Sequence, residues 1–181
     1  MKNSSIIYLV LICLLSIQCQ KKDNPFLITK DSIGLLNKES LVSELNSIYA
    51  QDSISRDTLS RQVINTKKIQ IYEKGGKHLL SLTPSLDSIQ KIENIRIYDS
   101  RFVTEKGVGI SSTFKDIKAN YTIKKIVTSL NNIVILLKDS DFYFTIDKKE
   151  LPANLRYTSN TTIEEVQIPD TAKIKYFMIG W

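Results

Sequence analysis

The chain has few of the side chains that carry out most enzyme chemistry and metal binding. Its 181 residues include two cysteines, one histidine and one tryptophan. Catalysis by a Ser–His or Cys–His pair needs an imidazole near the nucleophile, and only His78, beside an expected hairpin turn, could supply it. A zinc site needs three or four ligands at fitting spacing, which the sequence does not offer. We therefore predict no catalytic, cofactor-binding or metal-binding residues, and no enzyme.

Two short motifs suggest ligand sites only weakly. Asp139-Ser140-Asp141 could give oxygens to Ca²⁺, but no 12-residue loop with a central glycine surrounds it. Gly107-Val108-Gly109 precedes an expected helix, as in phosphate-binding loops, but a third glycine and a following Gly-Lys-Ser/Thr are missing. A glycosidase would need two carboxylates in a cleft, and the sequence shows no recognisable motif for such a cleft. Asp139-Ser140-Asp141 and Gly107-Val108-Gly109 are better explained as turns.

Arginine-rich segments are also missing, although the chain is basic. It has 25 lysines and arginines against 19 acidic residues, a formal charge of +6. The basic residues are scattered in pairs, without the interleaved aromatics of RNA-binding motifs. This pattern predicts no nucleic-acid partner and suits a surface near an anionic membrane.

No apolar run is long enough to cross a bilayer. Ile6 to Ile17 spans about 12 residues, whereas a membrane-spanning helix needs about 20. The run follows a short start with one positive charge and is succeeded by Cys19 and a polar stretch, an order typical of a secretory signal. A cysteine at this place resembles the lipobox of bacterial lipoproteins, whose thiol is acylated and becomes the first mature residue. The resemblance implies a signal peptide at 1–18, lipidation at Cys19 and a tether at 19–27.

The residue before Cys19 is Gln18, where a small residue is usual. This looser form resembles lipoproteins of the Bacteroidota, in which a Cys-Gln-Lys-Lys start is common. Cys13 is an alternative anchor, and a buried N-terminal helix with a chance cysteine is another interpretation. The tether holds a single acid, Asp23, unlike the acid-rich surface-export signal of Bacteroidota lipoproteins, so we expect an outer-membrane location facing the periplasm. One mature cysteine allows no intramolecular disulfide.

An internal correspondence with an offset of 72 residues predicts the fold. Ser40, Val42, Glu44, Leu45 and Tyr49 align with Ser112, Phe114, Asp116, Ile117 and Tyr121. Each copy has a hydroxyl N-cap, an early acidic residue and apolar positions spaced as on a short amphipathic helix. Three alternating apolar segments follow each copy, at 69–72, 79–82 and 92–98, and at 133–137, 142–146 and 173–179.

The order helix–strand–strand–strand, twice, predicts an α+β fold built as a tandem repeat of a helix packed on an antiparallel sheet. The first unit spans 28–103 and the second 104–181. The layout is similar to that of secreted β-lactamase inhibitor proteins, an analogy that implies no shared activity.

Four sequence motifs, taken in order along the chain, resemble those of a family of small enterobacterial envelope lipoproteins of unknown function. They are a Leu-x-Leu-x-Pro hairpin end at 80–84, the strand 92–97, a Gly-x-x-x-Gly-x-Thr-Phe-like helix start within 104–114, and a terminus ending at Trp181. That family carries a cysteine pair in its second half, which this chain lacks. The resemblance implies the fold and the anchor and no activity.

Asp-Ser/Thr-apolar triplets recur along the chain and resemble the acceptor motif of Bacteroidota periplasmic O-glycosylation, although they are also ordinary turn chemistry. The candidate acceptors are Ser32, Ser53, Thr58, Ser88 and Thr171. With no catalytic set, we expect a membrane-anchored, non-enzymatic binding, inhibitor or protective protein that engages the bilayer through Cys19 and another envelope protein or a toxin. The alternative is a structural or assembly accessory of the cell envelope. A pull-down from the solubilised envelope separates the two.

Overall fold

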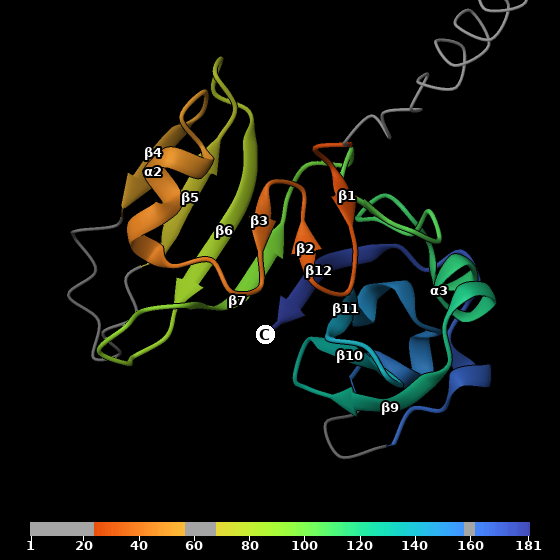
Figure 1. Ribbon diagram of the computed structural model, residues 1–181. Helices are drawn as coiled ribbons and strands as arrows, with labels where there is room; N and C mark the ends of the chain where they lie inside the picture. Colours follow the sequence, from red (N-terminus) through yellow and green to blue (C-terminus); the bar gives the residue numbers. More distant parts are fainter. Residues whose placement is uncertain (1–23, 57–67, 158–161) are drawn as a thin grey trace, which may run out of the picture.

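The computed structural model describes residues 24–56, 68–157 and 162–181, and most of its regular structure is β-strand (Figure 1). The strands are β1 (Leu27–Ile28), β2 (Ser32–Ile33), β3 (Leu36–Asn37), β4 (Ser53–Arg56), β5 (Ile69–Tyr72), β6 (His78–Pro84), β7 (Ile92–Ile97), β8 (Val103–Thr104), β9 (Ile123–Thr128), β10 (Asn132–Leu137), β11 (Phe142–Asp147) and β12 (Ile174–Gly180). The helices are η1 (Val42–Glu44), α2 (Leu45–Ile48), α3 (Phe114–Asn120), η2 (Lys148–Glu150), η3 (Ala153–Leu155) and η4 (Glu165–Gln167), where η denotes a 3₁₀ turn. None of the helices in these described parts is long and apolar enough to span a bilayer.

The strands form two sheets. The larger has eight strands in the order β4-β5-β6-β7-β12-β11-β10-β9, and the smaller has four in the order β3-β2-β1-β8. Each half of the larger sheet is an antiparallel meander, and the halves join where β7 pairs with β12. Figure 1 shows β4–β7 on one side and β9–β12 on the other, with the orange strands β1–β3 between them in this view.

Side-chain alternation, interrupted by register shifts in four of the strand pairs, gives the eight-stranded sheet two different faces. One row of paired residues is apolar on every strand: Ile54, Ile71, Leu80, Ile97, Phe177, Phe144, Ile135 and Ile126. The adjacent row, one residue away and therefore on the opposite face, is mostly polar: Ser55, Gln70, Ser81, Arg96, Met178, Tyr143, Leu136 and Lys125. The sheet thus has one core face and one open face, a name kept below for the second.

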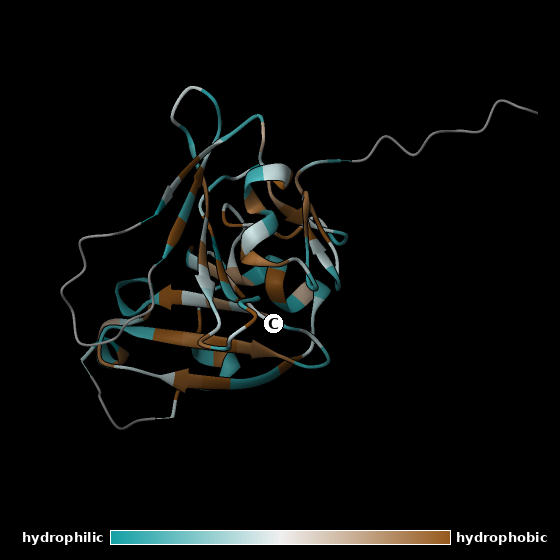
Figure 2. Cartoon of the chain, turned by 60° about the vertical axis from the view of Figure 1, so that its left-hand side comes forward, coloured by the Kyte–Doolittle hydropathy of each residue, from teal (hydrophilic) through white to brown (hydrophobic). Residues whose placement is uncertain are grey.

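The core face is covered by the small sheet, the helices and the segment between β11 and β12. Ile28, Ile33 and Leu36 of the small sheet, together with Leu45 and Ile117 of the two α-helices, are fully buried in one continuous hydrophobic cluster with the strands. Figure 2 shows the hydrophobic residues concentrated on the strands and the hydrophilic ones in the connecting turns. Because one cluster unites both halves, neither half has a separate core.

The small sheet fixes the start of the described chain. β1 pairs in parallel with β8, and Phe26 packs edge-on against Phe102 with ring centroids 5.1 Å apart. Gly34 has a φ of 57° between β2 and β3, and a Cβ there would lie 2.2 Å from the Pro25 carbonyl oxygen. Glycine is required at this turn. Residues 26 and 27, expected to belong to the tether, are part of the folded body.

The expected α+β fold class, a tandem repeat of a helix packed on an antiparallel sheet, is wrong. The two α-helices of the described chain have four and seven residues, too few to form a helical layer. The three strands expected in each unit are present, but β4 and β9 extend each half and β7–β12 pairing unites them. The apolar residues at helical spacing do enter the core: Leu45 and Ile117 are fully buried, but they lie on short helices within a mostly β structure.

The local 72-residue correspondence is nevertheless visible in hydrogen bonds. The backbone N–H of Leu41 donates to Glu44 Oε2 at 2.8 Å, and that of Thr113 donates to Asp116 Oδ2 at 2.7 Å. Ser40 Oγ accepts from the Asn37 N–H and Ser112 Oγ from the Gly109 N–H. The hydroxyl residues therefore close the preceding turn, and the N-caps are one residue later than expected.

Candidate functional site

The open face carries an aromatic ladder across three strands. The His78 ring, at the start of β6, stacks on Tyr72 of β5 and on Tyr98 just after β7, with centroids 4.6 and 3.8 Å away. His78 Nε2 lies 3.0 Å from Gln70 Oε1 of β5, which fits donation of its N–H. These side chains are half-buried by one another, and Tyr98 is 38% exposed. The stacking continues the open face along β5, β6 and β7.

Arg96 extends this ladder across the junction of the two halves. Its Cζ lies 4.6 Å from the ring centroid of Tyr98 and 3.8 Å from that of Tyr176 on β12. Burial, followed by the charge of Arg96, lowers the pKa of His78. The histidine is therefore neutral at neutral pH, and Arg96 carries the positive charge at this place.

On the other side of Arg96 the face is more apolar. Met178 is paired with Arg96 in register, and Tyr143 of β11 is paired with Met178. The Tyr143 hydroxyl lies 2.5 Å from Nδ2 of Asn94, which donates to it. Leu136 follows in the same row. Tyrosine, methionine and arginine are the residue types enriched where proteins bind proteins.

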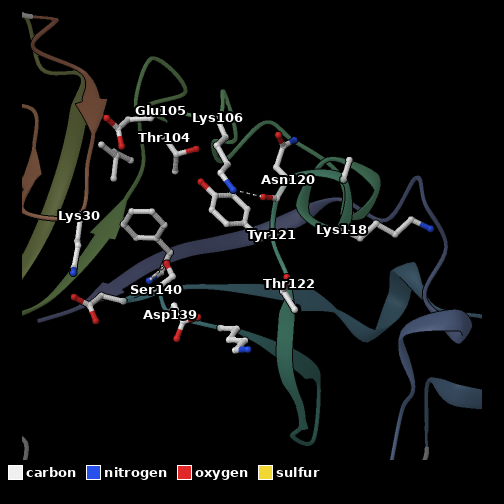
Figure 3. A pocket seen from close by; sticks show the side chains of 15 residues that line it. Lys30, Thr104, Glu105, Lys106, Lys118, Asn120, Tyr121, Thr122, Asp139 and Ser140 are labelled. Carbon is white, nitrogen blue, oxygen red and sulfur yellow. Dashed lines mark hydrogen bonds between the residues drawn. The ribbon is translucent and has the colours of Figure 1, made fainter.

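A pocket of about 530 Å³ opens where β1, β8, the end of α3 and the β10–β11 turn meet (Figure 3). Lys106 Nζ donates to the Asn120 carbonyl at 2.6 Å and lies 4.7 Å from the Tyr121 ring centroid. Burial raises the pKa of Tyr121. The lining mixes four lysines with three carboxylates: Lys30, Lys106, Lys118, Lys138, Glu105, Asp139 and Asp141. With both signs of charge around it, the pocket favours no one class of ligand.

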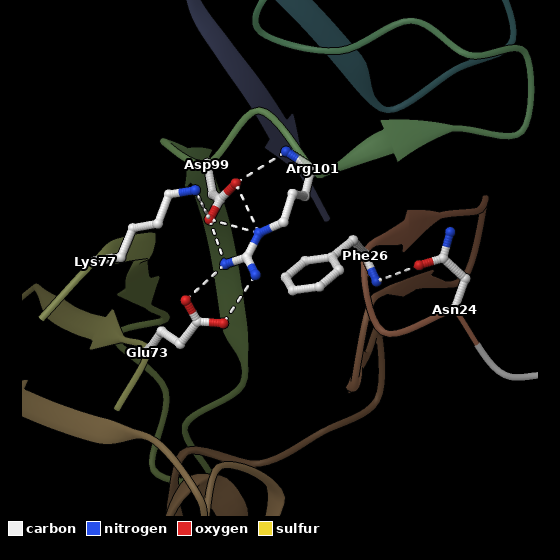
Figure 4. A network of polar contacts seen from close by, with 6 residues as sticks. All are labelled: Asn24, Phe26, Glu73, Lys77, Asp99 and Arg101. Atoms are coloured by element: carbon white, nitrogen blue, oxygen red, sulfur yellow. Dashed lines mark hydrogen bonds and ion pairs between the residues drawn. The ribbon is translucent and has the colours of Figure 1, made fainter. Parts of the chain in front are cut away.

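An ion-pair network centred on the buried Asp99 holds the β5–β6 turn to the end of β7 (Figure 4). The fully buried Asp99 carboxylate accepts hydrogen bonds from the Arg101 side chain and backbone N–H, and Lys77 Nζ lies 3.1 Å away. Burial acts to raise the pKa of Asp99, but these donors lower it to about 2. Arg101 also forms a two-pronged pair with Glu73 and lies 4.1 Å from the Phe26 ring centroid. All its charges are satisfied, so the network is structural.

The structure separates the candidate glycosylation residues and brings none of them together. Ser53, Ser88 and Thr171 are exposed, on the edge strand β4, in the β6–β7 loop and before β12. Ser32 is half-buried in β2, with its Oγ 2.8 Å from Thr29 Oγ1. Thr58 lies outside the described residues, as do Cys19 and the predicted signal peptide.

The weaker motifs are turns, as expected. Asp139 has a φ of 53° in the β10–β11 turn, and Asp141 pairs with Lys38 at 2.7 Å. Gly107 has a φ of 77°, and a Cβ on Gly109 would lie 2.6 Å from the Phe102 carbonyl oxygen. Across 24–56, 68–157 and 162–181, no group of three or more His, Cys, Asp or Glu side chains is arranged to hold a metal ion.

Sequence reasoning did not identify Arg96, Tyr143, Tyr176 or Met178 as functional candidates. The available signal was alternation for three of them: Arg96, Tyr143 and Met178 each stand between residues that are buried or packed against the core, whereas Tyr176 follows the half-buried Lys175. What alternation does not give is the pairing of β7 with β12, which brings residues 80 positions apart into contact.

Comparison with protein families finds no match, and none is found among curated proteins. Among solved structures, the uncharacterized protein yfeY from Escherichia coli is similar, with a TM-score of 0.54 and 12% identity over 85% of this chain and 99% of that chain. At this identity the likeness shows the fold alone.

Proposed function

We propose that the protein is a membrane-anchored envelope lipoprotein that binds another protein through the open face of its eight-stranded sheet. The observation that carries this proposal is the cluster of half-buried tyrosines around Arg96, with Met178 beside them. These side chains lie opposite the buried core face, so they are not needed to fill the interior. Their composition is that of the centre of an interface.

The dimensions of the face support a protein partner. Eight strands about 4.8 Å apart give a width of about 34 Å, and three rows of side chains give a height of roughly 20 Å. Measured along the twisted sheet, the area is roughly 700 Å², of the same order as the about 800 Å² that each partner buries in a standard interface. A small ligand would need a concave site, whereas a sheet face suits a broad contact.

The anchored part of the proposal rests on the lipobox-like sequence that ends at Cys19. Acylation of this residue would hold the domain at a membrane surface, where its net positive charge suits anionic lipid headgroups.

A photo-crosslinking scan in the cells that make the protein tests the binding proposal. A benzophenone side chain is placed at Tyr143, Tyr176 or Met178 on the open face, and at the exposed Lys115 and Val166 as matched controls away from it. We expect one discrete adduct shared by the three face positions and missing from the controls. The same adduct from Lys115 or Val166, or none from the face, would contradict the proposal.

A further inference from the structure

Arg96 differs from Arg101, whose guanidinium is paired with carboxylates. The guanidinium of Arg101 binds two carboxylates, Asp99 and Glu73. Arg96 packs over two tyrosine rings, and within the part of the chain that the structure describes it forms no ion pair and its buried Nε has no hydrogen-bond partner. The buried Nε cannot be reached from solvent, so an incoming acceptor can bind only the terminal Nη1 and Nη2 groups of Arg96.

Stacking on the tyrosine rings leaves the terminal in-plane N–H groups of the Arg96 guanidinium available to bind an acceptor. A guanidinium uses its flat faces on aromatic rings and its in-plane N–H groups on an acceptor. The N–H groups form a fork that matches a carboxylate in a two-pronged pair. The rings of Tyr98 and Tyr176 also restrict the side chain before any partner arrives, which reduces the entropy lost on binding.

The surrounding face favours a carboxylate over other anions. The paired row that contains Arg96 includes no acidic residue, and the cation beside it on the Tyr176 ring, Lys175, 5.4 Å from the ring centroid, is already paired with Asp147 at 2.8 Å. A nucleic acid or a phosphate cluster would need several adjacent cations. One arginine flanked by Met178 and tyrosines instead matches an acidic side chain with apolar neighbours.

We propose that Arg96 receives an aspartate or glutamate side chain from the protein that docks on the open face, with an apolar or aromatic neighbour of that acid resting on Met178 and Tyr143. This inference rests on the proposed function and specifies the chemistry of the partner.

A peptide selection tests it with the full chain in detergent. Twelve-residue displayed peptides are selected on the wild-type protein, and the binders are measured against Arg96→Gln, Arg96→Lys, Met178→Asp and the control Lys115→Gln, which lies away from the open face. Thermal unfolding first verifies that each variant is folded. We expect the binders to share an Asp or Glu next to an apolar residue. Affinity should fall at least tenfold for Arg96→Gln, by a smaller factor for Arg96→Lys, and by less than twofold for Lys115→Gln.

A double-mutant cycle supplies the decisive comparison. Changing the acid of a selected peptide to its amide should weaken binding to the wild-type protein at least tenfold, and should have no further effect on Arg96→Gln. Binders that lose affinity with Met178→Asp but tolerate Arg96→Gln would overturn the carboxylate assignment and leave the docking face intact. Binders whose affinity is unchanged by both Arg96→Gln and Met178→Asp would also contradict the assignment of the open face as the docking surface.

Discussion

Replacing Asp99 with asparagine tests the account of the ion-pair network around this buried carboxylate. The carboxylate is fully buried, and its donors lower its pKa from 3.8 to about 2. A shift of this size corresponds to about 2–3 kcal/mol of stability at neutral pH. We therefore expect Asp99→Asn to lower the free energy of unfolding by about 2–3 kcal/mol at pH 7. Asp87→Asn, at an exposed loop aspartate, should change it by less than about 0.5 kcal/mol.

The pH dependence distinguishes charge from packing. A lowered pKa in the folded state contributes stability above the unfolded value of 3.8, and this contribution is lost as the pH falls through about 2. The gap between wild type and Asp99→Asn should therefore shrink to less than about 1 kcal/mol by pH 2.5. Guanidinium denaturation of the full chain at pH 7, 4 and 2.5 measures it. An equal gap at all three values would show that the ionised carboxylate is not the source.

Three further predictions concern other parts of the chain. Leu45→Ala and Ile117→Ala should each cost about 2–5 kcal/mol because both side chains are fully buried, whereas Lys115→Ala should stay within about 0.5 kcal/mol in the same denaturation assay. The lowered pKa of His78 means that the unfolded chain binds its proton first, so stability should fall as the pH drops below about 6.5, and His78→Phe should remove this component of the pH profile between 7.5 and 5.5. Cys19→Ala should abolish labelling with a radioactive or clickable fatty acid, and persistent labelling would move the anchor to another residue, with Cys13 the first to test.

Local chemistry was readable from the sequence because it depends on neighbours in the chain. Alternation placed β5, β6, β7, β10, β11 and β12 within one or two residues of their positions. The acidic residues Glu44 and Asp116 were also recognised at the helix starts, but as first-turn charges and not as acceptors for the backbone N–H groups of Leu41 and Thr113.

Helix length and long-range pairing were not readable. The apolar spacing near Leu45 and Ile117 suggested helices that cover a sheet, but these elements stop after one or two turns and their apolar residues join a shared core. The β7–β12 pairing depends on tertiary packing, and it alone turns two meanders into one sheet with a continuous open face. The contact between Arg96 and Tyr176 therefore could not be predicted from the sequence.

The most direct test of the open face as a binding surface is the dissociation constant of the crosslinked partner for two matched variants. Met178→Asp places a negative charge at the centre of the face, and Val166→Asp places the same charge at an exposed site in η4. We predict that Met178→Asp weakens binding at least a hundredfold, while Val166→Asp changes it by less than twofold. Equal affinity for the two variants would contradict the assignment of this face as the binding surface.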